Sequence, residues 1–296
     1  YQFEEELAAC IGYFDGLHLG HQKLVEKTLT LAKHNKLKSA LITFEPDPWT
    51  VLNPDKKVRH LTPMKEKIRL VADLGLDYLV IVKFNKEVMG LSPQTFVESI
   101  LVNLKVRHLV CGEDFKFGYK GQGNVAYLKE HARHFFDTHS VPIETMHGIK
   151  LGTTQIIQAI LRGEMPFAAE MLGRSYKITG YVKQGNRAGT KIGFPTANLK
   201  VIDEYVIPKE GVYAGYATVL GKRYRSVVNI GYNPTFNHSE RLSIESYILD
   251  FNEMIYGELV HQSFDYYLRE EIKFDTIDDL VEQMHDDVKK ARDLLD

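Results

Sequence analysis

The sequence predicts an α/β domain with a parallel sheet, followed by a small antiparallel β-barrel domain that ends in a helix. The chain has 296 residues, which suits two domains better than one because a domain usually holds about 100 to 150 residues. Its first half alternates short apolar runs with helical patterns, whereas its second half carries strand-like runs with few helices between them. We expect the first domain at residues 1–165 and the second at residues 174–296.

In the first half, short apolar runs alternate with segments of helical periodicity. The expected strands span residues 7–11, 40–44 and 78–84, and the expected helices span residues 18–33 and 63–74. A repeated strand–helix unit is typical of a parallel sheet covered by helices.

Hydroxyl residues followed by proline mark two helix starts in this half. Thr62 precedes Pro63 and Ser92 precedes Pro93. Proline at the first helical position loses no hydrogen bond, and the hydroxyl before it can cap the helix. We expect Gly75 to close the helix that Pro63 begins.

The second half changes from the strand–helix pattern to strands. Residues 153–174, a helical segment interrupted by Gly163 and Pro166, form the expected join. Leu220 and Gly221 fit the turn of a hairpin. Five or six strands at this spacing indicate a small antiparallel barrel, and the strands expected are residues 178–182, 212–219, 224–230, 242–251 and 262–268.

A single helix is expected at the end of the chain. Thr276 with Asp279 three residues later has the shape of a capping box. Leu280, Met284 and Val288 then recur every four residues and give this helix an apolar stripe.

Composition narrows the class of protein. Hydrophobic residues make up 44% and charged residues 26%, with a net charge of -2, so the chain is folded and has no overall positive field for nucleic acid or acidic lipid. Cys10 and Cys111 lie far apart in apolar stretches, which predicts buried thiols and a reducing compartment. No apolar stretch is long enough to span a bilayer.

The start of the chain is acidic where a signal peptide would be basic, so we expect a cytoplasmic protein. Because the first residue is Tyr1 rather than Met, we also expect a few residues to precede it.

A glycine-rich turn at residues 12–21 joins the first expected strand to the first expected helix. Glycine lets backbone approach a ligand closely, and a helix start offers N–H groups and a positive dipole to an anion. His18 and His21 are three residues apart and would share one helix face, from which both can donate to phosphate oxygens. The segment predicts a phosphate site.

Two other interpretations of these histidines remain open. With Asp15 they offer three metal ligands, although no further His or Cys lies nearby in the sequence to complete a site. The other interpretation is that the two histidines only pack against their neighbours and bind no ligand.

Through this glycine-rich turn, the sequence resembles the nucleotidyltransferase superfamily, in which the motif His-x-Gly-His follows the first strand. It is most similar to the bifunctional bacterial riboflavin kinase/FMN adenylyltransferase (FAD synthetase) family, over essentially the whole chain. In the first half, residues 43–48, 84–101 and 112–118 carry the resemblance. It implies a Rossmann-like nucleotidyltransferase domain that transfers AMP from ATP to FMN, giving FAD and pyrophosphate.

The resemblance also implies roles for individual residues of the first half. The attacking FMN phosphate is already anionic, so the site needs donors and Mg²⁺ rather than a strong base. The catalytic donors would be His18 and His21. The implied nucleotide-binding or phosphate-binding residues are Gly12, Phe14, Asp15, Gly16, Gly20 and Thr154, and the implied flavin-binding residues are Asp114 and Phe117.

Two positions depart from the family pattern. Ile157 replaces the arginine that meets the triphosphate, and Arg162, five residues later, would be rotated by roughly 140° on an ideal helix. Asp47 stands where the family usually has His. Because losing a charge-assisted contact costs on the order of 1.5 to 3 kcal/mol, the sequence leaves open a kinase whose first domain adenylylates weakly or not at all.

A second motif opens the barrel half, at residues 185–198. It matches the flavokinase motif Gly-Phe-Pro-Thr-Ala-Asn completely. Thr196 offers a hydroxyl and Asn198 an amide oxygen, which are hard ligands of the kind that Mg²⁺ takes beside substrate phosphates.

The flavokinase resemblance implies a riboflavin phosphorylation site. Its nucleophile is a neutral ribityl hydroxyl, so a group must accept the proton, and the resemblance assigns this to Glu245. Arg269 is the implied flavin-binding residue of this half. The implied nucleotide-binding residues are Gly185, Gly189, Lys191, Gly193, Pro195 and Thr196.

The resemblance implies an enzyme that makes FMN from riboflavin and FAD from FMN. Its substrates would be riboflavin, FMN and ATP, with Mg²⁺ as cofactor and flavin as both substrate and product. No nucleic acid or membrane partner is expected, and the protein would be a monomer or weak oligomer. The alternatives are a kinase with a degenerate first domain and a flavin-binding regulatory protein without turnover.

Overall fold

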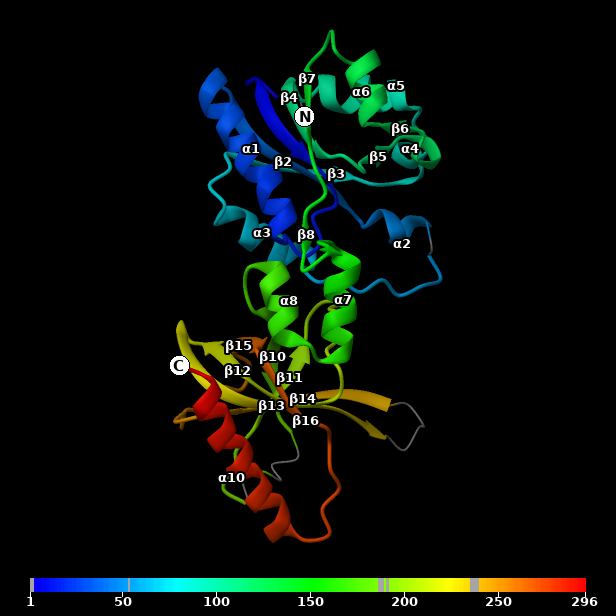
Figure 1. Ribbon diagram of the computed structural model, residues 1–296. Coiled ribbons are helices and arrows are strands. Elements are labelled where there is room, and N and C mark those ends of the chain that lie inside the picture. Colours follow the sequence, from blue (N-terminus) through cyan, green and yellow to red (C-terminus); the bar gives the residue numbers. More distant parts are fainter. Residues whose placement is uncertain (1–2, 53, 186–188, 190–191, 235–239) are drawn as a thin grey trace. The chain divides into compact units, whose positions relative to one another are not determined.

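The computed structural model describes residues 3–52, 54–185, 189, 192–234 and 240–296 (Figure 1). Its contacts divide the chain into two compact units, Tyr1–Thr153 and Thr154–Asp296, and each is described by itself. The division leaves helix α8 (Met165–Leu172) and all but the first residue of helix α7 (Thr153–Arg162) in the second unit. The domain limits 1–165 and 174–296 stay a prediction.

A sheet of five parallel strands forms the centre of the first unit, in the order β3-β2-β1-β4-β7 (Figure 1). This confirms the predicted parallel sheet. The strand order reverses between β1 and β4, and ligands of such sheets bind beyond the carboxyl ends of the strands at this switch point. The strands are β1 (Leu7–Ile11), β2 (Lys38–Glu45), β3 (Tyr78–Lys83), β4 (Val106–Gly112) and β7 (Asp137–Val141).

Alternating side chains of β1 supply two separate cores, because successive residues of a strand face opposite sides. Leu7, Ala9 and Ile11 join one cluster, and Cys10 joins the other with Leu24 of helix α1 (Leu19–Asn35). The sheet is therefore covered on both faces. The other regular helices of this unit are α2 (Pro48–Leu52), α3 (Met64–Ala72), α4 (Lys86–Met89), α5 (Pro93–Phe96) and α6 (Val125–His131).

Only one of the two predicted hydroxyl caps is present. Ser92 caps α5, since its hydroxyl accepts the N–H of Thr95 at 3.1 Å. Thr62 makes no such bond at α3; its hydroxyl instead accepts the N–H of Gly16 at 2.8 Å. The prediction for Thr62 was wrong because a buried partner outside the helix takes its hydroxyl.

The second unit contains a closed antiparallel barrel. Strands β13, β14, β11, β10, β15 and β12 pair in turn, and β12 pairs back to β13. This confirms the predicted barrel. The strands are β10 (Tyr176–Lys183), β11 (Ala197–Val201), β12 (Gly211–Val219), β13 (Lys222–Pro234), β14 (Glu240–Ile248), β15 (Leu259–Phe264) and β16 (Tyr266–Arg269).

The predicted hairpin turn and terminal helix are confirmed. Leu220 and Gly221 both have positive φ, 49° and 74°, the conformation that a tight two-residue hairpin requires. Helix α10 (Ile277–Leu294) begins after Thr276, whose hydroxyl accepts the N–H of Asp279 at 3.1 Å.

Two strand predictions were incomplete. Residues 262–268 form parts of two strands rather than one, because the chain changes partners at Asp265: β15 pairs with β10 and β12, whereas β16 pairs with β12 alone. Strand β11 was not predicted as a strand.

A buried polar network ties the barrel strands together through Gln262. Its amide nitrogen donates to the hydroxyl of Ser226 at 2.9 Å, and its amide oxygen accepts the hydroxyl of Ser246 at 2.7 Å. All three side chains are 0% exposed. Because buried polar groups are costly when unpaired, this residue links β15 to β13 and β14.

We expect Gln262→Ala to lower the free energy of unfolding by about 1 to 3 kcal/mol, since the buried hydroxyl of Ser246 loses its acceptor and that of Ser226, still bonded to the carbonyl of Gly215, loses its donor. Urea unfolding followed by far-UV circular dichroism measures this. The matched control is Gln158→Ala on the exposed side of α7, expected within about 0.5 kcal/mol of the wild type. Equal stability of the two variants would contradict a structural role for the network.

Candidate active sites

The glycine-rich loop at the carboxyl end of β1 is clamped by a buried carboxylate. Asp15 is 3% exposed and accepts the N–H groups of Leu61 at 3.1 Å and Thr62 at 2.8 Å. Burial raises the pKa of the Asp15 carboxyl, although these two N–H groups oppose the shift. The carboxylate therefore fastens residues 61–62 to the loop, and its part in the predicted phosphate site is to shape that loop.

Two of the loop glycines use their N–H groups inside the protein. Gly12 donates to the carbonyl of Ile42, and Gly16, with φ of 83°, donates to Thr62. Phe14 is fully buried beneath Gly12, so only its backbone is left for the predicted ligand contact. The first turn of α1, where Gly20 lies, offers further N–H groups to an anion, apart from that of His21, which His18 accepts.

The two histidines lie differently from the expectation that both share a helix face. His18 precedes α1 as its cap, with Nδ1 accepting the N–H of His21 at 3.3 Å. The rings stack with centroids 3.7 Å apart, and the ring of Phe14 packs edge-on against His21. The capping bond uses Nδ1 of His18 as an acceptor, which places the proton of a neutral ring on Nε2.

His21 carries an unsatisfied ring nitrogen. Its Nδ1 is buried and has no hydrogen-bond partner among the described residues. Burial, and then the neighbouring charges of His18 and Lys67, hold the pKa of His21 well below its ordinary value. The ring is neutral at pH 7 and can donate one N–H. Together with the helix start, this donor supports the predicted anion site.

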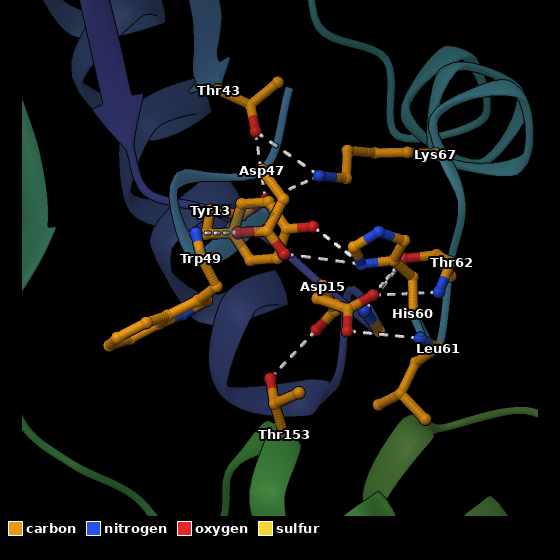
Figure 2. A network of polar contacts seen from close by, with 11 residues as sticks. Tyr13, Asp15, Thr43, Asp47, Trp49, His60, Leu61, Thr62, Lys67 and Thr153 are labelled. Carbon is orange, nitrogen blue, oxygen red and sulfur yellow. Dashed lines mark hydrogen bonds and ion pairs between the residues drawn. The ribbon is translucent and has the colours of Figure 1, made fainter. Parts of the chain in front are cut away.

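A second polar cluster adjoins this loop (Figure 2). Lys67 is 1% exposed; its ammonium donates to the carbonyl of Tyr13 at 2.6 Å and lies 4.3 Å from the centroid of that ring. Burial lowers the pKa of Lys67, while nearby carboxylates raise it. The phenol of Tyr13 lies 2.9 Å from Nδ1 of His60. Sequence reasoning missed Tyr13, His60 and Lys67 as site residues because they come from three separate segments.

Other residues predicted for this site lie elsewhere in the first unit. Phe117 is buried among Phe96, Phe115 and Tyr127, so its ring packs in the core, and its predicted flavin contact stays a prediction. Asp114 is exposed and pairs with Lys150 at 2.8 Å.

The start of α7 also carries a predicted residue. Thr154 is exposed. The neighbouring Thr153, which was not predicted, donates its hydroxyl to the carbonyl of Asp15 at 3.2 Å (Figure 2).

A cavity of about 520 Å³ opens in the second unit between the barrel and α10. That volume is in the range of small-molecule sites. Glu245 lies in its wall and accepts the hydroxyl of Thr196 at 3.3 Å on one oxygen and that of Ser243 at 2.9 Å on the other. The structure thus brings the predicted Thr196 and Glu245 together, and adds Ser243, which sequence reasoning missed.

Strand register places three polar residues in one row. On β14, Glu245 is paired with Asn198 of β11 on one side and with Asn229 of β13 on the other. Directly paired residues project from the same face of a sheet. Glu245 thus lies between two amide side chains, and of these only Asn198 was predicted as a site residue.

The apolar part of the cavity lining belongs largely to α10 and the segment before it. The predicted stripe of α10 lines it. Arg269 also reaches the wall, but its guanidinium is held by Asp287, 2% exposed, at 2.7 Å. Arg269 therefore positions α10, and its predicted flavin contact stays a prediction. The apolar lining is Val212, Val227, Ile272, Phe274, Leu280, Met284 and Val288.

The glycine motif closes one edge of this cavity. A Cβ at Gly189 would overlap the backbone carbonyl of Phe194, so this position requires glycine, and one at Gly185 would meet the side chain of Asn198. Gly193 has φ of 86° and Pro195 is exposed. The predicted Lys191 lies outside the described residues.

The donor set suits a magnesium ion bound mainly by substrate. Thr196 and Asn198 supply oxygen atoms, and Mg²⁺ usually takes one or two protein ligands beside waters and phosphates. Within the described ranges, no group of three or more His, Cys, Asp and Glu side chains is placed to hold a metal. The residues fit a shared ion of this kind rather than a closed protein site.

Comparison with known families matches both units. The FAD synthetase family matches residues 1–155, and the riboflavin kinase family matches residues 172–295. A bifunctional riboflavin kinase/FMN adenylyltransferase from Listeria monocytogenes is 40% identical over 283 residues, which cover 95% of this chain and 90% of that protein. The Bacillus subtilis protein of the same name is 38% identical over 284 residues, covering 95% of this chain and 90% of its own.

A solved structure also matches along the chain. It is described as a macrolide-efflux protein from Streptococcus pneumoniae and has a TM-score of 0.91 at 30% identity, covering 98% of this chain and 95% of its own. Across the described segments of the present chain, no helix is long and apolar enough to cross a membrane.

The neutral His21 ring predicts a pH dependence of stability. Because its folded pKa is depressed, the unfolded chain binds the proton first as pH falls below about 6.5, and stability is lost there by up to about 1.4 kcal/mol per pH unit. We expect His21→Gln to reduce this loss between pH 7 and pH 5.

Urea unfolding followed by the fluorescence of Trp49, the chain's one tryptophan and a residue of the first unit, measures the effect. His34→Gln, at an exposed position, is the matched control. An unchanged pH slope in the His21 variant would show that the buried ring is not the group responsible.

Proposed function

The chain belongs to the bifunctional riboflavin kinase/FMN adenylyltransferase family, and we propose that its two candidate sites carry the two reactions of that family. The second unit phosphorylates riboflavin to FMN, and the first unit transfers AMP to FMN to give FAD. The observation that carries the proposal is Glu245, a carboxylate held by two hydroxyls in a cavity with an apolar wall. Both family matches favour this function over a kinase with a degenerate first domain.

In the kinase reaction the terminal ribityl hydroxyl attacks the γ-phosphate of ATP, Glu245 accepts its proton, and ADP leaves as the bond to the β,γ-bridging oxygen breaks. The apolar wall from α10 suits the flavin ring, which orients the ribityl chain toward Glu245. The hydroxyls of Thr196 and Ser243 fix the carboxylate. A magnesium ion beside Thr196 and Asn198 would neutralise phosphate charge.

In the adenylyl transfer a phosphate oxygen of FMN attacks the α-phosphate of ATP, and pyrophosphate leaves. The first turn of α1 and the stacked rings of His18 and His21 supply hydrogen-bond donors for the developing charge. No base is required, since the nucleophile is already ionised. The neutral state of His21 fits a donor better than a proton acceptor.

Several expectations stay part of the proposal. These are the magnesium requirement, a cytoplasmic location, a monomeric or weakly associated state, and the absence of nucleic-acid and membrane partners. Incubating the protein with FMN, ATP and Mg²⁺ and separating products by chromatography tests the adenylyl transfer. Lack of FAD under every condition would favour the monofunctional alternative, and conversion of riboflavin to FMN would exclude a regulatory protein without turnover.

Single substitutions should separate the two reactions. We expect Glu245→Gln to abolish FMN formation, because the proton acceptor is lost, while FAD formation from FMN continues. His21→Ala should do the reverse, slowing FAD formation by about one to two decades through loss of one donor. Chromatographic assays with riboflavin and with FMN measure both. Loss of both activities in either folded variant would contradict independent sites.

Ser243 should act as a positioning residue for Glu245. We expect Ser243→Ala to lower kcat of FMN formation by about tenfold with little change in KM, since it orients the base and touches no substrate. Ser243→Thr keeps the hydroxyl and should restore most of the rate. A change confined to KM, or equal effects of the two substitutions, would contradict this role.

A further inference from the structure

Three side chains from three separate segments meet at the edge of the glycine-rich loop (Figure 2). Nδ1 of His60 lies 2.9 Å from the phenol of Tyr13 and 3.5 Å from a carboxylate oxygen of Asp47. The Asp47 side chain is 3% exposed, and its other oxygen accepts the N–H of Trp49 at 2.7 Å. Burial at this depth requires Asp47 to have such partners.

The position of His60 is fixed from two sides. The two residues that follow it, Leu61 and Thr62, donate their N–H groups to the buried Asp15. Its ring is held at Nδ1 by Tyr13 and Asp47. The histidine is therefore attached to the same loop that leads into α1, and its ring has little freedom to turn.

The other ring nitrogen of His60 is left for a ligand. Nε2 makes no hydrogen bond to a described residue and is not among the buried atoms that lack one. The side chain is 19% exposed. A ring that is anchored at one nitrogen and open to solvent at the other is suited to present a single group in a fixed direction.

Two arrangements of the anchoring bonds place a proton on Nε2. Burial and neighbouring carboxylates raise the pKa of Tyr13 far above its ordinary value, so its hydroxyl keeps its hydrogen. If that hydroxyl donates to Nδ1 of a neutral ring, Nε2 carries the ring proton. If the ring is protonated and faces Asp47, both nitrogens carry one. In both arrangements the outward nitrogen donates, whereas a neutral ring that keeps its proton on Nδ1, facing Asp47, leaves Nε2 as an acceptor.

We propose that His60 is a phosphate-binding residue of the adenylyl transfer, with Nε2 donating to the triphosphate of ATP and with Asp47 and Tyr13 as its positioning residues. The proposal rests on the proposed function of the first unit. The chain has Asp47 where a histidine is usual, and the structure supplies an imidazole beside that carboxylate from position 60. The charged groups around the cluster are Lys67, Asp15, Glu45 and Asp47, and Lys67 is the cation among them.

Two near-isosteric substitutions separate anchoring from ligand binding. Asn places an amide nitrogen where Nδ1 lies and removes Nε2, whereas Gln places one near Nε2 and gives up Nδ1. We expect His60→Asn to slow FAD formation and raise KM for ATP by about 10-fold to 100-fold, and His60→Gln to stay within about threefold of the wild type. FMN formation should be unchanged in both, which checks folding. His34→Asn, on the exposed surface of α1, is the matched control.

Binding is measured separately with α,β-methylene-ATP, titrated against the fluorescence of Trp49. This residue is 61% exposed, and its backbone N–H donates to Asp47. Because Trp49 belongs to the first unit, its fluorescence reports on that unit. We expect the dissociation constant to rise about tenfold in His60→Asn and to stay unchanged in His34→Asn.

The inference is overturned if His60→Asn binds and turns over like the wild type, or if the Asn and Gln variants lose equal activity, since both results assign the ring a structural role only. A wild-type protein that forms no FAD would contradict the proposed function instead. The titration with α,β-methylene-ATP would then still test whether His60 binds phosphate.

Discussion

A carboxylate removed from water must be given hydrogen-bond donors, and the first unit is organised around how Asp15 obtains them. Its two oxygens accept the backbone N–H groups of Leu61 and Thr62. Leu61 lies 46 positions after Asp15 in the chain. These hydrogen bonds close the segment after β2 onto the loop after β1. The same contacts bring His60 beside Tyr13, and the hydroxyl of Thr62 accepts the N–H of Gly16. The helix cap predicted at Thr62 is lost to this contact.

The second unit also buries a carboxylate that needs hydrogen-bond donors, at the place where α10 packs against the barrel. Asp287 is 2% exposed, and three hydrogen bonds from the Arg269 guanidinium satisfy it. Breaking a buried pair of this kind leaves an uncompensated charge, which is far more costly than losing an exposed one. The pair holds the apolar stripe of α10 over the cavity, so the wall that suits a flavin ring depends on a polar contact behind it.

The two sites differ in how their residues are assembled. In the barrel, register alone aligns Asn198, Glu245 and Asn229, because neighbouring strands carry them. In the first unit, the residues around the loop come from a helix start, a strand end and a connecting segment. A site on paired strands can be built from short motifs, whereas a site made of connecting segments depends on long-range contacts. This difference explains why the residues of the barrel site were easier to predict from the sequence.

Local patterns in the sequence determined the parallel sheet, the barrel, the hairpin at Leu220 and Gly221, and the cap at Thr276. Each of these depends on periodicity or on a few adjacent residues. The glycine turn followed from its own residues, and motif resemblance named Thr196 and Glu245, whose hydrogen bond to each other came only with the tertiary structure. Only the tertiary structure decided that Phe117 is a core residue, that Asp15 shapes its loop, and that His60 lies beside Asp47. Burial and partnership at those positions come from residues distant in the chain, and no local pattern of side chains encodes which distant groups will be brought into contact.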